Sequence, residues 1–254
     1  MCQGNPWRIP PLLSAHALEV GVSCLVNLMK DAIYQNLIAE NRWKYIANGL
    51  GVTLRITLFA VIIGIVLGFL VAVVRSTYEK THKLKLLNLI CQVYLTVIRG
   101  TPMVVQLLIM YYIVFVSVTS KIMVASLAFG INSGAYVAEI IRGGIQSIDN
   151  GQFEAGRSLG FNYPQAMIYI ILPQVFKNVL PALANEFIVL LKETSVCGYI
   201  ALQDLTKGGD IIRSQTYNAY VPLFTVALIY LVMVMIFTQL VKILERRLRS
   251  SERR

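Results

Sequence analysis

Long apolar runs separated by short polar links dominate the chain, and they predict a bundle of membrane-spanning helices. A helix needs about 20 predominantly apolar residues to cross the hydrocarbon core of a bilayer. Runs of this length occupy 45–74, 122–146 and 219–241, and further apolar stretches cover 84–118 and 163–200. The pattern therefore predicts an all-α integral membrane protein with five transmembrane helices.

The second and fourth runs are interrupted. In the 84–118 run, the sequence RGTP at 99–102 leaves two pieces that are each too short to cross alone. We expect one broken helix whose first part lies along the inner membrane surface. Backbone groups freed inside a membrane must be satisfied by protein or by a water-filled cavity. In the fourth run, Pro173 and Pro181 are expected to bend or break the helix, which leaves a span of 179–199.

Composition agrees with a membrane protein and argues against other classes. Hydrophobic residues make up 56% of the chain and charged residues 14%, whereas soluble domains carry about 25% charged residues. The net charge of +10 is concentrated in a predicted loop at 75–85 and in the C-terminal tail. Lys and Arg are retained on the cytoplasmic side. Both clusters therefore predict topology, with the C-terminus cytoplasmic and the N-terminus outside, rather than a nucleic-acid site.

The chain is expected to divide into three parts. Residues 1–44 form an extension and pre-span segment, the transmembrane domain covers 45–248, and a basic cytoplasmic tail follows at 249–254. Residues 1–28 lack the basic start and apolar core of a signal peptide. We expect Met29 to be the natural start, with a disordered tail as the alternative.

A short polar segment lies between the third and fourth spans. Asp149 or Asn150 can cap the start of a helix that includes Glu154, and Gly160 is suited to end it in a left-handed turn. A second helix start follows at 162–164, where a proline fits the first turn. A compact helix exposed between two spans indicates a docking site for another protein. The link at 200–216, after the fourth span, is expected to be a loop on the outer side.

The spacing of this polar segment resembles the EAA loop of ABC importer permeases. That loop reads EAA, three residues, G, nine residues, I, one residue, LP, and 154–173 reads EAGRSLGFNYPQAMIYIILP. Gly replaces the usual third Ala, at a cost of about 1 kcal/mol in helix stability. The resemblance implies a coupling helix that contacts a cytoplasmic ATPase through Glu154, Ala155, Gly156, Arg157 and Gly160.

Three further stretches resemble the histidine/glutamine/arginine branch of polar-amino-acid permeases. These are RGTP at 99–102, GAYVAEIIRGG at 134–144 and NEFIVLLKETS at 185–195. The resemblance implies a type I ABC importer permease fold in a bacterial cytoplasmic membrane. It also implies a second permease subunit, identical or homologous, an extracytoplasmic solute-binding protein, and ATP with Mg held by the ATPase.

Glu186 is the intramembrane residue with the strongest functional signal. A carboxylate inside a span costs a few kcal/mol unless it is paired or hydrated. It could hold the ammonium group of a passing amino acid, and the alternative is a structural ion pair with Lys192 or Arg99. In the family that the chain resembles, the Asn-Glu region lines the translocation path. The predicted substrate path consists of Asn185, Glu186, Arg99, Thr101 and Gln106.

Two other pairs in the spans are expected to be structural. Glu139 and Arg142 are three positions apart and can pair on one helix face. Gly64 and Gly68 form a small-residue pair that lets another helix approach closely.

No catalytic or metal chemistry is predicted. The segment GQFEAGRS at 151–158 nearly matches a phosphate-binding P-loop, but Arg157 replaces the required Lys and no hydrophobic strand precedes it. The two histidines and four cysteines show no metal-ligand spacing, and Cys91 and Cys197 are expected to be buried. We expect no cofactor in this chain. An ion-gradient-driven secondary amino-acid transporter is the alternative function, but the inverted repeats expected of that class are not found.

Overall fold

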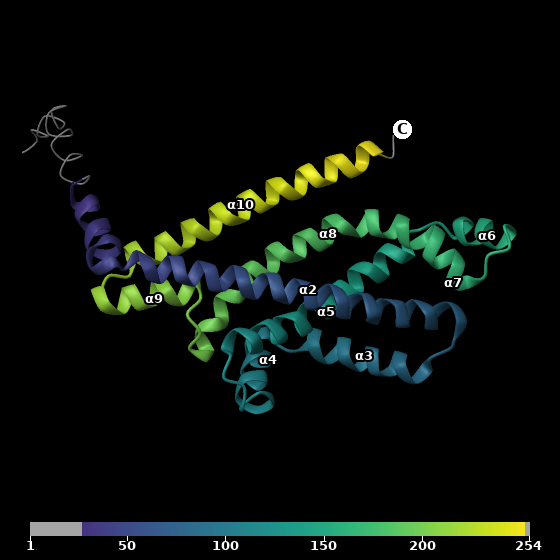
Figure 1. Cartoon of the computed structure of the whole chain (residues 1–254), viewed down its shortest axis with the longest axis horizontal. Helices are drawn as coiled ribbons and strands as arrows, with labels where there is room; N and C mark the ends of the chain where they lie inside the picture. The colour runs from purple at the N-terminus through teal and green to yellow at the C-terminus, as the bar shows by residue number, and fades with distance from the viewer. Residues whose placement is uncertain (1–26, 252–254) are drawn as a thin grey trace, which may run out of the picture.

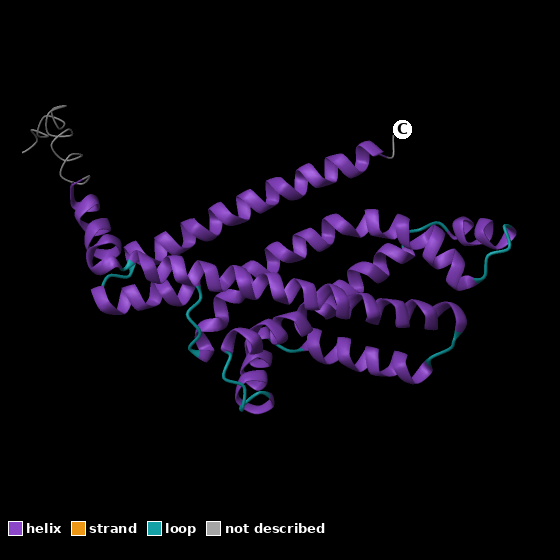
Figure 2. Ribbon diagram, viewed as in Figure 1, coloured by secondary structure: helices purple, strands orange, loops and turns teal. Residues whose placement is uncertain are grey.

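The computed structural model describes residues 27–251, and this part of the chain is helical with no strand (Figures 1 and 2). The predicted all-α class is confirmed. The expectations for residues 1–28 fall almost entirely outside the described residues. In chain order the elements are a helix at 27–33, η1 (Tyr34–Ile38), η2 (Ala39–Asn41), α2 (Trp43–Thr81), α3 (Lys85–Gly100), α4 (Met103–Ile109), η3 (Met110–Val114), α5 (Lys121–Gln146), α6 (Asn150–Ser158), α7 (Tyr163–Ala166), η4 (Met167–Ile171), α8 (Leu172–Glu193), η5 (Thr194–Ile200), α9 (Leu205–Thr216) and α10 (Tyr220–Ser251).

Four described stretches are long and apolar enough to cross a membrane: Trp43–Thr81, Lys121–Gln146, Tyr163–Ile200 and Tyr220–Leu248. Lys85–Gly100 and Met103–Val114 form a bent pair, with an angle of 111° at the break between them, and count as a fifth span if taken together. The break at RGTP is therefore confirmed. The total of five spans remains a prediction.

Helices α2 and α5 pack together at the centre of the bundle and run in the same direction. Gly64 faces Ser133, and one turn further on Gly68 faces Val137. A Cβ atom on Gly68 would lie 2.5 Å from Val137 Cγ1, so the two helices approach as closely as glycine allows. The predicted role of the small-residue pair is confirmed.

The bundle has two distinct ends (Figure 1). One end, which we call the α6 end, carries α6, the link from α2 to α3 and the C-terminus. At the other, the α9 end, α9 packs against the first turns of α2, where a Cβ on Gly208 would lie 2.5 Å from the Tyr45 carbonyl oxygen. Figure 1 shows α10 leaving α9 and running back toward the α6 end, and midway along it Phe237 packs on Phe187 of α8 with ring centres 4.9 Å apart.

The prediction of a loop at 75–85 is wrong for most of that range, because α2 continues to Thr81. Its 39 residues span about 58 Å at 1.5 Å per residue, more than the roughly 30 Å of hydrocarbon core. Arg75 and Glu79 extend the helix because both pair with α5. Only residues 82–84 form the link.

Two expectations about the interrupted runs are also wrong. Helix α3 runs beside α2 (Figure 1), and Cys91 and Leu95 pack against Val71, so it does not lie across the bundle along a membrane surface. Helix α8 continues through Pro181 without ending. The irregularity lies earlier, where the wide π-helical turn of η4 comes directly before the first turn of α8, which contains Pro173. The Leu172 amide bonds the Met167 carbonyl of this wide turn. Pro173 itself has no amide to donate to the helix.

The link at 200–216 is not a loop, because α9 occupies Leu205–Thr216. Asp204 caps its first turn, accepting hydrogen bonds from the amides of Thr206 and Lys207, each at 3.1 Å. Glycine has a low helix propensity, so the adjacent Gly208 and Gly209 make this segment look less helical in the sequence. In the structure both glycines are positions of close packing, Gly208 against α2 and Gly209 against Val226 of α10.

Candidate functional site

The polar segment between α5 and α8 folds as a capped helix, as predicted. The Asp149 side chain accepts a hydrogen bond from the amide of Gly151 at 2.6 Å. At the other end, the amide of Phe161 reaches the Gly156 carbonyl at 3.1 Å and that of Gly160 reaches Arg157 at 2.9 Å. This is the bonding pattern of a Schellman motif, and Gly160 adopts the left-handed conformation that it requires, with φ of 85°.

A second cap follows immediately and fixes the direction of the next helix. The side chain of Asn162 accepts from the amide of Gln165, and the side chain of Gln165 accepts from the amide of Asn162, at 3.0 and 2.9 Å. This reciprocal pair is a capping box. Both ends of α6 are therefore fixed: Asp149 caps its start, and the Gly160 turn closes its end directly before the Asn162 cap of α7.

Most of the predicted coupling residues lie on the outside of α6. Glu154, Ala155, Arg157 and Gly160 are exposed, and Gly156 alone is buried. Leu159 follows at the helix end with 74% of its surface exposed. The sequence analysis overlooked this side chain, although an apolar residue in an otherwise polar cap was the available signal.

Gly156 lies against the start of the next helical segment. A Cβ at this position would be 3.0 Å from Ile170 Cδ1 and 3.3 Å from Ala166 Cβ. Gly156, which replaces the usual alanine of the family pattern, lowers the stability of the helix, but it also lets α6 pack closely against Ala166 and Ile170. An alanine here would need the flexible end of Ile170 to move by a few tenths of an ångström.

Helix α6 is tied to the last turn of α2. Lys80 Nζ donates to Asn150 Oδ1 at 3.1 Å and lies 5.1 Å from the centre of the Phe153 ring. Phe153 in turn stacks on Tyr163 with ring centres 5.9 Å apart. On its other side, α6 contacts α8 through Gln152 and Gln174.

The break in the second span is held from inside by Gln106. Its side-chain nitrogen donates to the carbonyls of Ile98 and Thr101 and to the Thr101 hydroxyl, at 2.7, 3.1 and 2.8 Å. Its oxygen accepts from Asn132 of α5 at 3.0 Å. Protein, rather than water, satisfies these groups, as a break in a membrane segment requires. The Gln106 side chain is thus buried, and both its nitrogen and its oxygen are hydrogen-bonded to protein groups, whereas Arg99 and Thr101 are exposed.

Glu186 lies on α8 and forms none of the predicted ion pairs. Its partner is the hydroxyl of Ser133 on α5, which donates to Oε1 at 2.9 Å. Among the described residues no ion pair joins Glu186 to Lys192 or Arg99. Neighbouring Asn185 is exposed. The alternative of a structural ion pair between Glu186 and Lys192 or Arg99 is therefore wrong in this conformation. The Glu186 carboxylate is partly exposed and bonds the Ser133 hydroxyl.

Glu139 and Arg142 form the predicted ion pair, with Arg142 Nη2 2.8 Å from Glu139 Oε2. The pair belongs to a larger cluster that the sequence did not predict. Arg75 Nη1 lies 3.0 Å and Arg99 Nη1 3.9 Å from Glu139 Oε1, and Arg142 Nη1 lies 3.6 Å from Glu79. One carboxylate thus contacts arginines from three helices.

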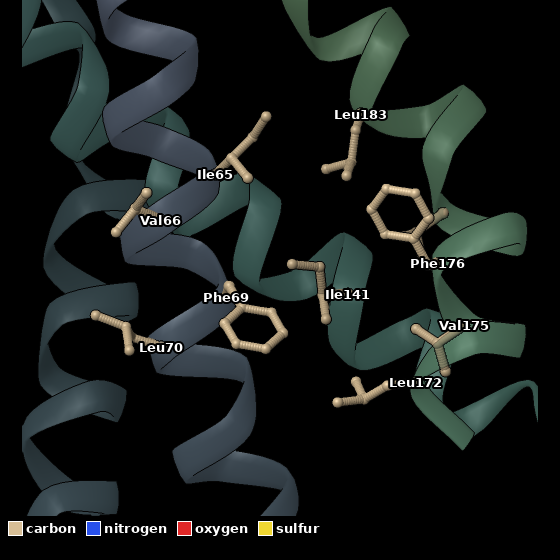
Figure 3. A pocket seen from close by; sticks show the side chains of 10 residues that line it. Ile65, Val66, Phe69, Leu70, Ile141, Leu172, Val175, Phe176 and Leu183 are labelled. Atoms are coloured by element: carbon tan, nitrogen blue, oxygen red, sulfur yellow. The ribbon is translucent and has the colours of Figure 1, made fainter. Parts of the chain in front are cut away.

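A groove of about 320 Å³ opens between α2, α5 and α8, and its lining is wholly apolar (Figure 3). Ile65 and Phe69 of α2 face Leu172 and Phe176 of α8 across it, with Ile141 of α5 between them. No lining side chain offers a donor or acceptor to a polar solute. The polar groups discussed above lie elsewhere in the bundle.

Two carboxylates at the α9 end have shifted pKa values for different reasons. Burial raises the pKa of Asp204, against the opposing effect of its hydrogen bonds from Lys207 and Thr206. Hydrogen bonds from Lys207 and then Arg213 lower the pKa of Asp210, which lies 2.8 and 2.6 Å from their nitrogens. No group of three or more metal-ligating side chains occurs among the residues that the structure describes. Cys91 and Cys197 are free and buried, as expected.

A bundle of long apolar helices, broken at one point and carrying a capped polar helix between two of them, is the architecture of a multi-pass membrane protein. The chain belongs to the family of binding-protein-dependent transport system inner membrane components, whose model matches residues 64–250. It is therefore a permease of the ABC-transporter type, and the comparisons favour this class over a secondary transporter.

Named relatives lie within this family. The chain is 38% identical over 208 residues to a putative glutamine transport system permease protein, GlnP, of Rickettsia felis (strain ATCC VR-1525 / URRWXCal2), covering 80% of this chain and 93% of the relative. It is 39% identical over 212 residues to the arginine transport system permease protein ArtQ of Bacillus subtilis (strain 168), covering 82% and 94%.

Solved structures show the same fold. An amino acid ABC transporter crystallised with histidines matches with a TM-score of 0.74 and 44% identity, over 80% of this chain and 94% of that chain. The MetNI methionine ABC transporter, in inward-facing form, matches with a TM-score of 0.72 over 83% and 99%. Because the sequence identity to the second structure is only 20%, that match supports the fold alone. Together they agree with the type I importer architecture predicted from the sequence.

Proposed function

We propose that this permease carries polar amino acids across the bacterial cytoplasmic membrane, powered by a separate ATPase that binds α6. The capped helix itself is the observation that supports this most directly. Its exposed face combines Glu154 and Arg157 with the apolar side chain of Leu159, and the Asp149 cap and the turn at Gly160 hold its two ends. A rigid, polar helix with an apolar tip suits a groove on a partner protein. Relatives named for glutamine, arginine and cystine transport support an amino-acid substrate.

In this proposal the α6 end is cytoplasmic. Lys83 lies in the link between α2 and α3 and Lys85 directly follows it, and the basic end of α10 lies at the same end of the bundle (Figure 1). Positive charge is retained in the cytoplasm. The α9 end and the N-terminus would then be outside, where an extracytoplasmic solute-binding protein would deliver the substrate.

A second permease subunit, identical or homologous, would complete the path. Helix α8 exposes Asn178, Asn185 and Lys192 at intervals of seven residues, which places them on one face. Polar groups at membrane depth avoid lipid and face protein or water. Two subunits that met along this face would enclose it. ATP and Mg would be bound by the ATPase, and this chain would need no cofactor of its own.

Within that path, Asn185 and Glu186 would contact the substrate, with the carboxylate receiving its ammonium group. Arg99 would attract the substrate carboxylate. Thr101 and Gln106 would shape the path by holding the break. Glu186 is suited to its role because its hydrogen bond from Ser133 orients it without neutralising its charge.

Uptake by the assembled complex in vesicles tests the proposal. Permease and ATPase are reconstituted with the binding protein, and amino-acid uptake and ATP hydrolysis are measured together. Glu154→Ala and Gly160→Asp should insert normally but lose ATP-driven uptake, because the first removes a docking charge and the second strains a backbone with φ of 85°. Glu40→Gln, in η2 just before α2 and at the opposite end of the bundle, is the control. Wild-type uptake by Gly160→Asp, or uptake without nucleotide, would refute the coupling role.

A further inference from the structure

Glu139 is the meeting point of three helices. Its two oxygens contact Arg75 of α2, Arg99 of α3 and Arg142 of α5. A carboxylate between helices needs at least one close cation, because an unpaired charge away from water is costly. Three arginines are more than this requirement demands.

The three contacts are unequal. Arg75 and Arg142 are mostly buried, with 19% and 25% of their side chains exposed, and lie 3.0 and 2.8 Å from the carboxylate. Arg99 is 46% exposed and 3.9 Å away. Arg99 can therefore leave Glu139 without stranding the carboxylate, whereas Arg75 and Arg142 hold the carboxylate where it is.

Arg99 sits immediately before the break in the second span. The chain around the break makes three polar contacts with α5: Gln106 bonds Asn132, Arg99 reaches Glu139, and Arg99 also lies 5.8 Å from the centre of the Tyr136 ring. Further back in α3, the Tyr94 hydroxyl donates to the Ile131 carbonyl of α5 at 2.6 Å. Asn132 and Glu139 are seven positions apart, about two helical turns, and so share one face of α5. The Gln106–Asn132 contact is buried, whereas the Arg99–Glu139 contact is long and partly exposed. Loss of the Arg99–Glu139 contact would let the last turn of α3, beyond Tyr94, move relative to the Gln106–Asn132 contact.

The other side of the cluster leads to α6. Arg142 also contacts Glu79 of α2, and the adjacent Lys80 bonds Asn150 and covers Phe153. Polar contacts thus continue from α6, through the last turn of α2 and the end of α5, to Glu139. Packed contacts of this kind can carry coupling between sites, and only measured coupling demonstrates it.

We propose that Glu139 is a positioning residue that holds or releases Arg99 according to the position of α6. A displacement of α6 would pull on Lys80 and the Glu79–Arg142 contact, shift Glu139, and free the end of α3 beside the break. The break would then open or close the path in step with the ATPase. This inference rests on the proposed docking of the ATPase on α6.

The test compares uptake per ATP hydrolysed in the reconstituted complex for Glu139→Gln, Arg99→Gln and the double variant. We expect each single variant to retain ATP hydrolysis and to lower uptake per ATP about tenfold, within the range typical of coupling between sites. The double variant should be no worse than Glu139→Gln alone, because that variant already removes the contact that holds Arg99. Glu139→Asp, which keeps the charge, should recover part of the loss.

Glu40→Gln, which removes the Arg42–Glu40 ion pair at the far end of α2, is the matched control and should leave uptake per ATP unchanged. Additive losses in the double variant, or an unchanged ratio in Glu139→Gln, would overturn the proposal. A parallel loss of hydrolysis and uptake in Arg99→Gln would also overturn it, because the proposal requires hydrolysis to continue when the Arg99–Glu139 contact is lost. Failure of ATPase docking is separately visible, because Gly160→Asp would then transport normally.

Discussion

Asn132 of α5 donates a hydrogen bond to the side-chain oxygen of Gln106, 3.0 Å away, and so joins the broken second span to the centre of the bundle. Gln106 in turn satisfies two carbonyls and a hydroxyl around the break. A single buried amide thus makes an interruption of the helix compatible with a membrane environment. The same amide fixes the point about which the rest of the broken span is placed.

Replacing Gln106 with Leu should destabilise the permease by several degrees in thermal unfolding measured in detergent. The change removes every partner that Gln106 offers to the break and to Asn132. Each buried polar group left without a partner costs about 1–3 kcal/mol. Asn132→Ala removes only one of these bonds, so its effect should be smaller. Equal melting temperatures for wild type and Gln106→Leu would contradict the role of the side chain.

Glu186→Gln should weaken substrate handling while leaving insertion and assembly intact. The amide can still accept from Ser133 but no longer carries charge. A hydrogen bond to a charged group is worth about 1.5–3 kcal/mol, so the apparent KM for uptake should rise about tenfold or more. Ser133→Ala, which keeps the charge, should have a smaller effect. Unchanged uptake kinetics in Glu186→Gln would make the carboxylate purely structural.

Two glycines of α2 should respond oppositely to alanine. A Cβ on Gly68 would lie 2.5 Å from Val137, whereas a Cβ on Gly51 meets nothing within 4 Å. Gly51→Ala should stabilise the helix by up to about 1 kcal/mol through propensity alone. Gly68→Ala should lower the melting temperature, because α2 and α5 must separate. The same sign of change in both variants would rule out close packing as the reason for Gly68.

Asp204 should make stability depend on pH. Burial raises its pKa above the ordinary 3.8, so the folded state binds more protons than the unfolded state between the ordinary and the raised value. The free energy of unfolding therefore falls as pH rises through that window. Asp204→Asn keeps a capping oxygen without titrating, and the stability of wild type relative to this variant should decline over that range.

Asp204→Ala provides the matched comparison, because it loses the cap of α9 and should cost about 1 kcal/mol at every pH. Thermal unfolding of the three proteins across the acidic range measures both effects. A wild type that gained stability relative to Asp204→Asn with rising pH would show that the carboxyl is stabilised in its charged form instead.

The fold class and the capped helix between α5 and α8 were predictable because their signals are local. Apolar length alone indicates helices that span a membrane. The ends of α6 depend on Asp149 and Gly160 and the start of α7 on Asn162, each with its immediate neighbours. The same local reasoning failed where tertiary contacts override it. Arg75 and Glu79 read as a charged loop, yet they continue α2 because their partners lie on α5.

The sequence by itself determined that this chain is a helical membrane permease with one broken span and one capped polar helix, because hydrophobic patterning and helix capping act over a few residues. Tertiary structure alone decided the partners of the buried polar groups. Glu186 meets Ser133 rather than a cation, Gln106 closes the break through Asn132, and Glu139 gathers arginines from three helices. These pairings join residues up to 64 positions apart. These pairings depend on how the helices pack against one another, and the pattern of apolar and polar residues along a short stretch of sequence does not predict that packing.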